Sequence, residues 1–241
     1  STTLSFAQNS YTAKKEMTLH FKGEDGTNGA AVVWNPDKKV YYSVIAGNET
    51  YPLETFLSGG SVQYTGTAGL DTRGIWYNPK TQKLEGNGAG EVGIFTHNMN
   101  ASGEPRDAEV VISGQCQPDF QSVGAFEPKK QVIYYFYDGK IYTYKRKTGK
   151  ASKSFELKNS PVGISSLNST TVVYTGRKSE ELGLYDFDAK KVYLFDLKGN
   201  YKASVSLPSG SIAPDMFRFS FANGNIWLYD IDSRTWTGYS F

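Results

Sequence analysis

A run of apolar residues, a polar turn that contains proline and a second apolar run recur along this chain. The pattern reads VVWNPDKKVYY at residues 32–42, GIWYNPKTQKLEG at residues 74–86 and GAFEPKKQVIYY at residues 124–135. Proline fixes φ and needs no ladder N–H, so it suits the turn between two strands. Each copy therefore predicts a β-hairpin.

Two weaker copies extend the repeat towards the C-terminus. Aligning all five copies places Pro36, Pro79, Pro128, Asn168 and Asn223 at the turn. The copies lie roughly 48 residues apart, and a period near 40–50 residues with short strands is typical of a β-propeller blade. The sequence predicts an all-β fold, a single propeller of five blades with four antiparallel strands each.

The repeat also assigns strands to positions within the blades. Innermost strands are expected at 30–34, 74–77, 123–126, 162–166 and 217–221. Second strands are expected at 40–45, 83–86, 132–137, 171–174 and 225–230. Only four outer strands follow, at 62–65, 109–112, 153–157 and 201–207. The fifth is expected from the N-terminal segment 14–21, which would complete the last blade and remove an open sheet edge.

Two other architectures fit parts of the pattern. A β-sandwich also contains many short strands. Six blades would result if residues 183–187 and the N-terminal TLSFA, residues 3–7, formed additional strands. In the five-blade arrangement, segment 179–188 is interpreted as an insertion in blade four.

Composition agrees with a β fold and narrows the functional classes. Aromatic residues make up 15% of the 241 residues and there are 25 glycines, as strands and tight turns favour. The length suits one all-β domain over residues 1–241. A formal net charge of +2 gives no reason to expect nucleic acid as a partner.

The sequence offers few residues for cofactor, metal or disulfide chemistry. Cys116 is the single cysteine and is expected to be an inert thiol, since only His20 and His97 could support it as a nucleophile. No cofactor and no metal site are expected. No apolar stretch approaches the roughly 18 residues of a membrane span, so no membrane insertion is expected. The start STTLSFAQNS, without Met, together with low cysteine content, indicates an exported protein, secreted or periplasmic.

The repeats resemble generic propeller repeats of the NHL and YVTN type. The likeness rests on VYYSVIAGN and VIYYFYDGKIYTY, where an aromatic-rich second strand follows the turn. The last unit, NIWLYDIDSRTWTGYSF, resembles a kelch unit but lacks the Gly-Gly pair. The resemblance implies the fold and no particular function, because such repeats occur in proteins with many functions.

Candidate site residues lie in and beside the loops that lead into the innermost strands. These loops are expected to form the rim of a central channel. The predicted rim residues are Asp25, Asp71, Arg73, Asp119, Asp215, Arg218, Trp34 and Trp76. Carboxylates from several blades could share a cation or divide acid and base roles. No catalytic residue is assigned among them.

Each of these signals also has a structural interpretation. Aspartate at a strand start often caps a turn through backbone hydrogen bonds. Trp34 and Trp76, with Tyr77 and Phe120, could fill the space between blades instead of stacking on a ligand. Residues 140–158 contain seven Lys or Arg, which could bind an acidic polymer but also fit one solvated strand face.

Two functional hypotheses remain. The first is a non-catalytic binding or interaction propeller of an exported or cell-envelope protein. It would be monomeric and would recognise a carbohydrate, a peptide or an envelope partner at the channel rim. The alternative is a carbohydrate-active enzyme, a glycoside hydrolase or lyase, that uses channel carboxylates.

Overall fold

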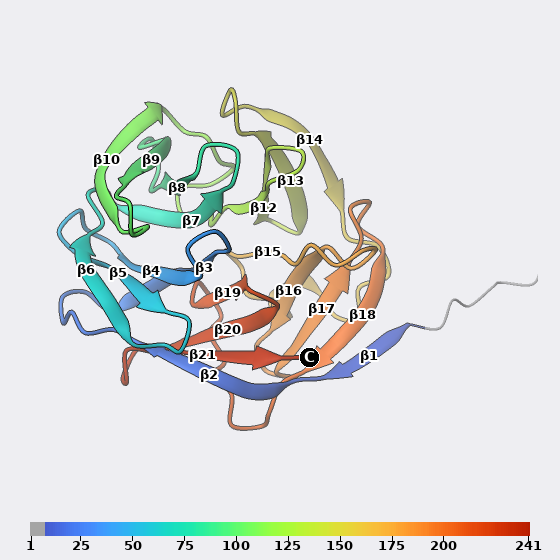
Figure 1. Cartoon of the computed structure of the whole chain (residues 1–241). Helices are drawn as coiled ribbons and strands as arrows, with labels where there is room; N and C mark the ends of the chain where they lie inside the picture. Colours follow the sequence, from blue (N-terminus) through green and yellow to red (C-terminus); the bar gives the residue numbers. More distant parts are fainter. Residues whose placement is uncertain (1–7) are drawn as a thin grey trace, which may run out of the picture.

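Five antiparallel sheets radiate from a common axis in the computed structural model of the chain, which describes residues 8–241 (Figure 1). Blade 1 contains β3 (Asn28–Asn35), β4 (Val40–Ala46), β5 (Pro52–Leu57) and β6 (Val62–Thr67). Blade 2 contains β7 (Thr72–Asn78), β8 (Lys83–Gly88), β9 (Ile94–Met99) and β10 (Pro105–Ile112). Blade 3 contains β11 (Ala125–Glu127), β12 (Val132–Tyr137), β13 (Lys140–Lys145) and β14 (Ala151–Glu156).

The last two blades use both ends of the chain. Blade 4 contains β15 (Val173–Tyr174), β16 (Leu182–Asp186), β17 (Lys191–Phe195) and β18 (Tyr201–Ser206). Blade 5 contains β19 (Phe219–Ala222), β20 (Asn225–Asp230), β21 (Thr235–Ser240) and β2 (Lys14–His20). The prediction of five four-stranded blades is confirmed, and the six-blade alternative is wrong for residues 8–241.

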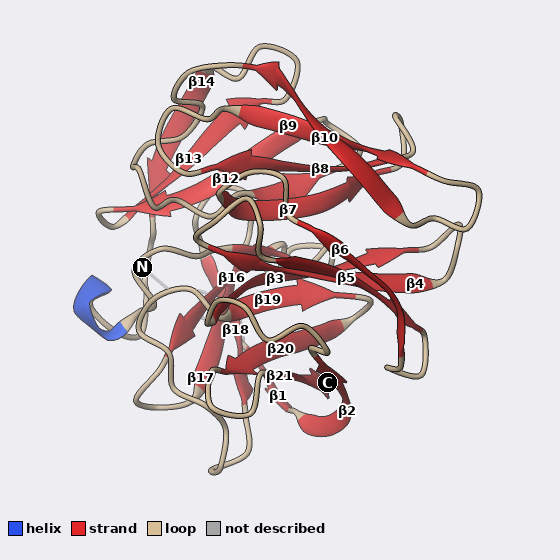
Figure 2. Cartoon of the chain, turned by 90° about the vertical axis from the view of Figure 1, so that its left-hand side faces the viewer, coloured by secondary structure: helices blue, strands red, loops and turns tan. Residues whose placement is uncertain are grey.

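Helix is scarce in the described residues, where it is limited to a 3₁₀ turn at Ile164–Ser166 (Figure 2). Within residues 8–241, no helix has the length and apolar character that a membrane span requires. The further strand predicted at residues 3–7 lies outside the described residues.

The N-terminal segment closes the ring. β2 pairs antiparallel with β21, with Leu19 opposite Trp236, which confirms the outer strand predicted at 14–21. β1 (Asn9–Thr12) was not predicted and pairs in parallel with β18 of blade 4. Figure 1 shows the segment running along the outside of β21 and then beside β18. One segment therefore joins the outer edges of two neighbouring blades.

Blade 4 corrects four sequence-based assignments. Residues 162–166 form no inner strand and instead include the 3₁₀ turn. The inner strand is β15, part of the segment predicted as the second strand. The second strand is β16, which lies within the segment interpreted as an insertion. Asn168 does not lie at a hairpin turn. It is fully buried, and its side-chain amide donates to the backbone carbonyls of Pro214 and Phe217.

A single turn device explains the repeat in the sequence. A polar side chain at the end of one strand accepts a hydrogen bond from a turn N–H two or three residues later, and the fourth residue after it has φ near +55°. The accepting residues are Asn35, Asn78, Glu127, Asp186 and Asp230. In blades 1–3 the device joins the first and second strands. In blades 4 and 5 it joins the second and third strands, so Asn168 and Asn223, which the sequence alignment placed beside the prolines, are not copies of it.

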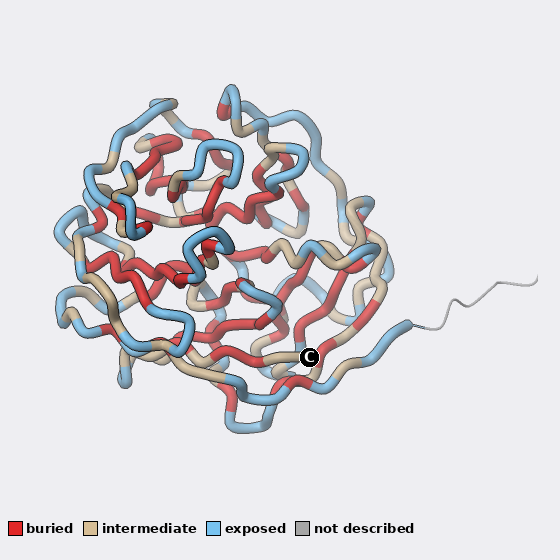
Figure 3. The backbone as a smooth tube through the Cα atoms, viewed as in Figure 1, coloured by how far each residue is buried: buried red, intermediate tan, exposed pale blue. Residues whose placement is uncertain are grey.

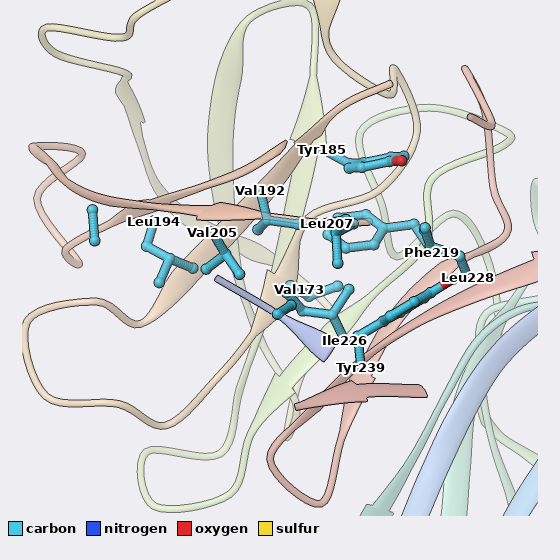
Figure 4. Packing of buried hydrophobic residues seen from close by; sticks show 12 residues of the cluster. Val173, Tyr185, Val192, Leu194, Val205, Leu207, Phe219, Ile226, Leu228 and Tyr239 are labelled. Carbon is cyan, nitrogen blue, oxygen red and sulfur yellow. The ribbon is translucent and has the colours of Figure 1, made fainter. Parts of the chain in front are cut away.

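The hydrophobic core lies in layers between neighbouring blades. Val40 and Tyr42 pack towards blade 2, whereas the intervening Tyr41 packs towards blade 5. Figure 4 shows the layer between blades 4 and 5, where Val192 of β17 meets Ile226 of β20. Figure 3 shows burial concentrated in the inner strands. Because both faces of each blade are covered, these strands read as continuous apolar runs rather than strict alternation.

Removing residues 1–20 is expected to unfold the ring. Leu19, which the truncation removes, is fully buried. Phe21 is also buried, and it would no longer be held in place by the preceding strand β2. Burial of each such side chain contributes roughly 1.5–3 kcal/mol, against a total stability of about 5–15 kcal/mol. Thermal melting of the truncated chain should show a large loss of cooperativity or insolubility. Removal of residues 1–8, which leaves β1 and β2 in place, is the control. Equal melting temperatures for both truncations would contradict closure by β2.

Candidate functional site

The inner strands of all five blades surround a cavity of about 360 Å³. Its lining runs from the middle of each inner strand to the turns that follow, including Pro36, Pro79, Pro128, Gly176 and Asn223. We call this end of the propeller the hairpin face, defined by the loops 36–39, 79–82, 128–131, 175–181 and 223–224. The opposite crossover face carries the loops 21–27, 68–71, 113–124, 157–172 and 207–218. The cavity opens on the hairpin face.

One aromatic side chain from each blade lines this opening. These mouth aromatics are Trp34, Tyr77, Phe126, Tyr174 and Phe221. Each is the last residue of its inner strand or the residue before the last. Equivalent positions of a circular repeat lie around a common axis. The five aromatic rings are therefore close together in space although they are far apart in the sequence.

Neighbouring side chains hold the mouth aromatics in place. Trp34 lies against Tyr41, with ring centroids 4.6 Å apart. Phe126 stacks on Trp76 of the adjacent blade, at 5.4 Å and an interplanar angle of 17°. Ring pairs of this kind add about 0.5–1.5 kcal/mol beyond area burial. The mouth is therefore built before any ligand arrives.

The two tyrosines at the mouth are neutral hydrogen-bonding groups at ordinary pH. Burial, together with a 2.6 Å hydrogen bond to Asp37, raises the pKa of Tyr77 well above its usual value. Burial raises the pKa of Tyr174 to about 12, and the nearby Glu127 and Glu181 add to the effect. Both phenols thus keep their protons, and neither serves as a base.

The cavity lining, in the part of the chain that the structure describes, is mostly apolar, with a few polar groups and no charged side chain. Among the described residues that line it there is no Asp, Glu, His, Lys or Arg. Thr171, Thr175, Ser220 and Asn223 contribute hydroxyl and amide groups. Each inner strand also pairs with one neighbour only, so its other edge faces the channel. Such a site can stack on rings and exchange neutral hydrogen bonds, but its walls supply no carboxylate pair for acid–base chemistry.

A buried ion pair supports the wall of the cavity at Trp76. The indole N–H of Trp76 donates to Glu85, 3.2 Å away, and Glu85 also accepts two hydrogen bonds of 2.9 Å from Arg146 of blade 3. Burial alone would raise the pKa of Glu85, but the hydrogen bonds from Arg146, Asn78 and Trp76 outweigh it and hold that pKa below its usual value. Glu85 therefore positions Trp76 as a charged acceptor.

The predicted charged rim residues lie on the crossover face, and none of the six lines the cavity within the described part of the chain. Asp71 accepts hydrogen bonds from Arg73 at 2.6 Å and from the backbone of Gly47 at 3.0 Å. Arg73 also donates to Gln121 at 2.7 Å. These side chains bind one another and the backbone, and their role in ligand binding stays a prediction.

The other charged rim residues are similarly placed in loops. Asp119 accepts the N–H of Gln121 at 3.0 Å, as a turn cap does. Asp25 and Asp215 are exposed, and Arg218 is half-buried with φ at +57°. Among the described residues, no cluster of three or more His, Cys, Asp or Glu is arranged to hold a metal ion.

Two of the eight predicted residues, Trp34 and Trp76, line the cavity. Of the other aromatics considered, Tyr77 is a mouth aromatic, whereas Phe120 is 55% exposed on the crossover face. The sequence carried a signal for Phe126, but not for Tyr174 or Phe221 of blades 4 and 5. In blades 1–3 the mouth aromatic is the residue directly before the accepting residue of the turn device, and the same alignment identifies Phe126.

Comparison with known proteins supports the fold and nothing finer. No protein-family model matches this sequence, and no curated protein matches it significantly. A glutaminyl cyclase from Myxococcus xanthus is similar in structure, with a TM-score of 0.62 and 8% identity over 97% of each chain. A gluconolactonase from Xanthomonas campestris is also similar, with a TM-score of 0.55 and 11% identity over 98% of this chain and 99% of that one. The propeller fold is therefore shared with enzymes, at identities that carry no residue roles.

Substituting Arg146 by Met should leave the buried Glu85 carboxylate without its charged partner. Breaking a buried pair by removing one partner costs about 3–5 kcal/mol. Because the pKa of Glu85 is lowered in the folded protein, the stabilisation by the charged pair is present at pH values above the usual carboxyl pKa of 4.5. It is lost as the pH falls below that value. Chemical denaturation at pH 7 should show the full loss, and the difference from the unsubstituted protein should shrink towards pH 4.

The double variant Arg146→Met with Glu85→Gln is the control for this experiment. It removes the charge as well as its partner, so it should be more stable than Arg146→Met alone at pH 7. Equal stability of the single and double variants would contradict the account of the pair.

Alanine substitutions should distinguish the aspartates of the crossover face that stabilise the fold from those that do not. Asp71→Ala and Asp119→Ala each remove hydrogen bonds to the backbone and should lower the free energy of unfolding by about 0.5–1.5 kcal/mol. Asp215→Ala should leave it within about 0.5 kcal/mol, since Asp215 is exposed. Urea titrations measure all three. Equal losses in all three variants would contradict the structural roles of Asp71, which bonds the backbone of Gly47, and of Asp119, which caps a turn.

Proposed function

We propose that this chain is a non-catalytic binding module and that its ligand enters the channel mouth on the hairpin face. The observation that carries the proposal is the ring of mouth aromatics around a cavity whose walls carry no charged side chain. Small-molecule sites typically have volumes of about 300–1,000 Å³ and apolar or aromatic linings with a few polar groups. The volume and lining of this cavity fit that description.

The ligand class that this chemistry favours is the end of a carbohydrate. A pyranose ring presents apolar C–H faces, which can stack on indole and phenyl rings, and a rim of hydroxyl groups. The hydroxyls of Ser220 and Thr175 already donate to the carbonyls of Val32 and Glu180, so towards those sugar hydroxyls they can act only as acceptors. The Asn223 amide, which donates to Tyr41, adds a carbonyl oxygen, and the channel edges of the inner strands add backbone groups. A peptide could use the same edges, but it would not need an aromatic side chain from every blade.

An enzyme is the second candidate, because both structural neighbours named above are enzymes. Incubation of the protein with gluconolactone, and separately with a peptide that begins with glutamine, tests the two reactions those names describe. Turnover that persists in purified protein and is lost with Asp71→Asn or Asp119→Asn would favour the enzyme over the binding module.

Trp34→Ala should weaken carbohydrate binding at least about tenfold. Truncating a central tryptophan of a binding site typically costs 2 kcal/mol or more, and 1.4 kcal/mol corresponds to tenfold. A glycan array should first identify a bound sugar, and calorimetric titration should then compare the variant with the unsubstituted protein.

Phe120→Ala is the matched control, since Phe120 is an exposed aromatic on the opposite face. Its affinity for the sugar should be unchanged. Loss of binding in Phe120→Ala with normal binding in Trp34→Ala would move the site to the crossover face and refute the proposal.

A further inference from the structure

Lysines are frequent in the loops beside the channel mouth. They belong to the loops of the hairpin face in blades 1–4 and are Lys38, Lys39, Lys80, Lys129, Lys130 and Lys178. All six residues are exposed, and none takes part in an ion pair within the described part of the chain. The neutral cavity thus opens between loops of four blades that carry these exposed lysines.

The acidic residues of the same loops are already engaged. Asp37 accepts the phenolic O–H of Tyr77. Glu180 lies 3.9 Å from Arg177, and Glu181 accepts a backbone N–H of its own loop. Their charges lower the local potential only in part, because the cations of these loops outnumber them. The mouth keeps an excess of positive charge.

The two faces of the propeller differ in charge. The crossover loops carry five carboxylates against three cations, so their balance is acidic; the carboxylates are Glu24, Asp25, Asp71, Asp119 and Asp215, and the cations are Lys22, Lys158 and Arg218. The whole chain has a formal net charge of only +2, so the basic mouth does not follow from an overall excess of basic residues. Potentials of one sign around a concave site raise the local concentration of ligands of the opposite sign.

We infer that the ligand is an acidic carbohydrate, an oligosaccharide that carries carboxylate groups such as those of uronic acids. This inference rests on the proposed function and names its ligand class. The sugar ring stacks on the mouth aromatics while its carboxylates lie among the lysines of the hairpin face. The lysines increase the association rate and select acidic over neutral sugars.

The shape of the site favours a carbohydrate end over a nucleic acid. A protein that binds single-stranded nucleic acid uses a charged groove along which successive bases stack. Here the mouth aromatics form a ring around one cavity of about 360 Å³ rather than a row. One terminal sugar ring can enter the cavity, whereas a single-stranded nucleic acid finds no row of aromatic side chains on which successive bases could stack.

Calorimetric titration with two probes of equal length tests the inference. The probes are a galacturonic acid oligomer and a neutral galactose oligomer. The acidic probe should bind more tightly, and raising salt from 50 to 200 mM should weaken its binding several-fold while leaving the neutral probe almost unaffected. An oligothymidylate of similar charge should bind more weakly than the uronate.

The double variant Lys129→Gln with Lys130→Gln should reduce the preference for the acidic probe. Exposed ion pairs correspond to about a two- to fivefold change per lysine. The matched control is Lys140→Gln with Lys153→Gln, which removes the same charge from exposed strand positions of the same blade. In the control, the ratio of the two dissociation constants should not change.

The outcomes distinguish the inference from the proposed function. Equal, salt-independent binding of both probes, with Trp34→Ala still weakening each, would overturn the inference and keep the binding module. Absence of binding by either probe would overturn both. Tighter binding of the oligothymidylate than of the uronate would overturn the choice of a carbohydrate.

Discussion

Every blade of this propeller buries both of its faces against its neighbours, and the rest of the structure depends on that requirement. Side chains along β4 alternate between the two adjacent blades, as do those along β20. An end blade would expose one such face to water, so the ring must close. Closure is achieved by β2, which brings the N-terminal segment beside β21, and β1 extends the same segment onto β18. The ring in turn fixes the positions of the inner strands and hence the channel.

Much of this architecture could be predicted from the sequence, because the turn device repeats in a recognisable form. The proline-containing turns identified the first hairpins of blades 1–3. The missing fifth outer strand, together with the place of segment 14–21 before the first inner strand, identified the closing strand. Blade 4 could not be predicted in the same way. Its copy of the device, at Asp186, joins the second and third strands and contains no proline, and Asn168 was aligned in its place. The hydrogen bonds of such a turn are local and are the same in either hairpin, so the pattern does not reveal which hairpin it marks.

The site was harder to predict than the fold for a related reason. A repeat shows that equivalent positions meet around an axis, but not which end of the channel stays open. At the crossover face, the buried amides of Asn87 and Asn168 tie the crossover loops to one another through backbone carbonyls, contacts between residues far apart in sequence. Asp71, Arg73 and Asp119 there hold loops through hydrogen bonds, whereas Trp34 and Trp76 line the cavity. Segregation of charge between two faces is likewise invisible in a net charge of +2.

The central claim is that ligand binds at the hairpin face, in the channel mouth. A crystal structure of the protein with a galacturonic acid oligomer tests it most directly. The account predicts a sugar ring stacked against Trp34 or Phe126, with a carboxylate within reach of the ammonium groups of Lys38 or Lys129. Sugar density on the crossover face, against Arg73 and Gln121, with an empty mouth would contradict it.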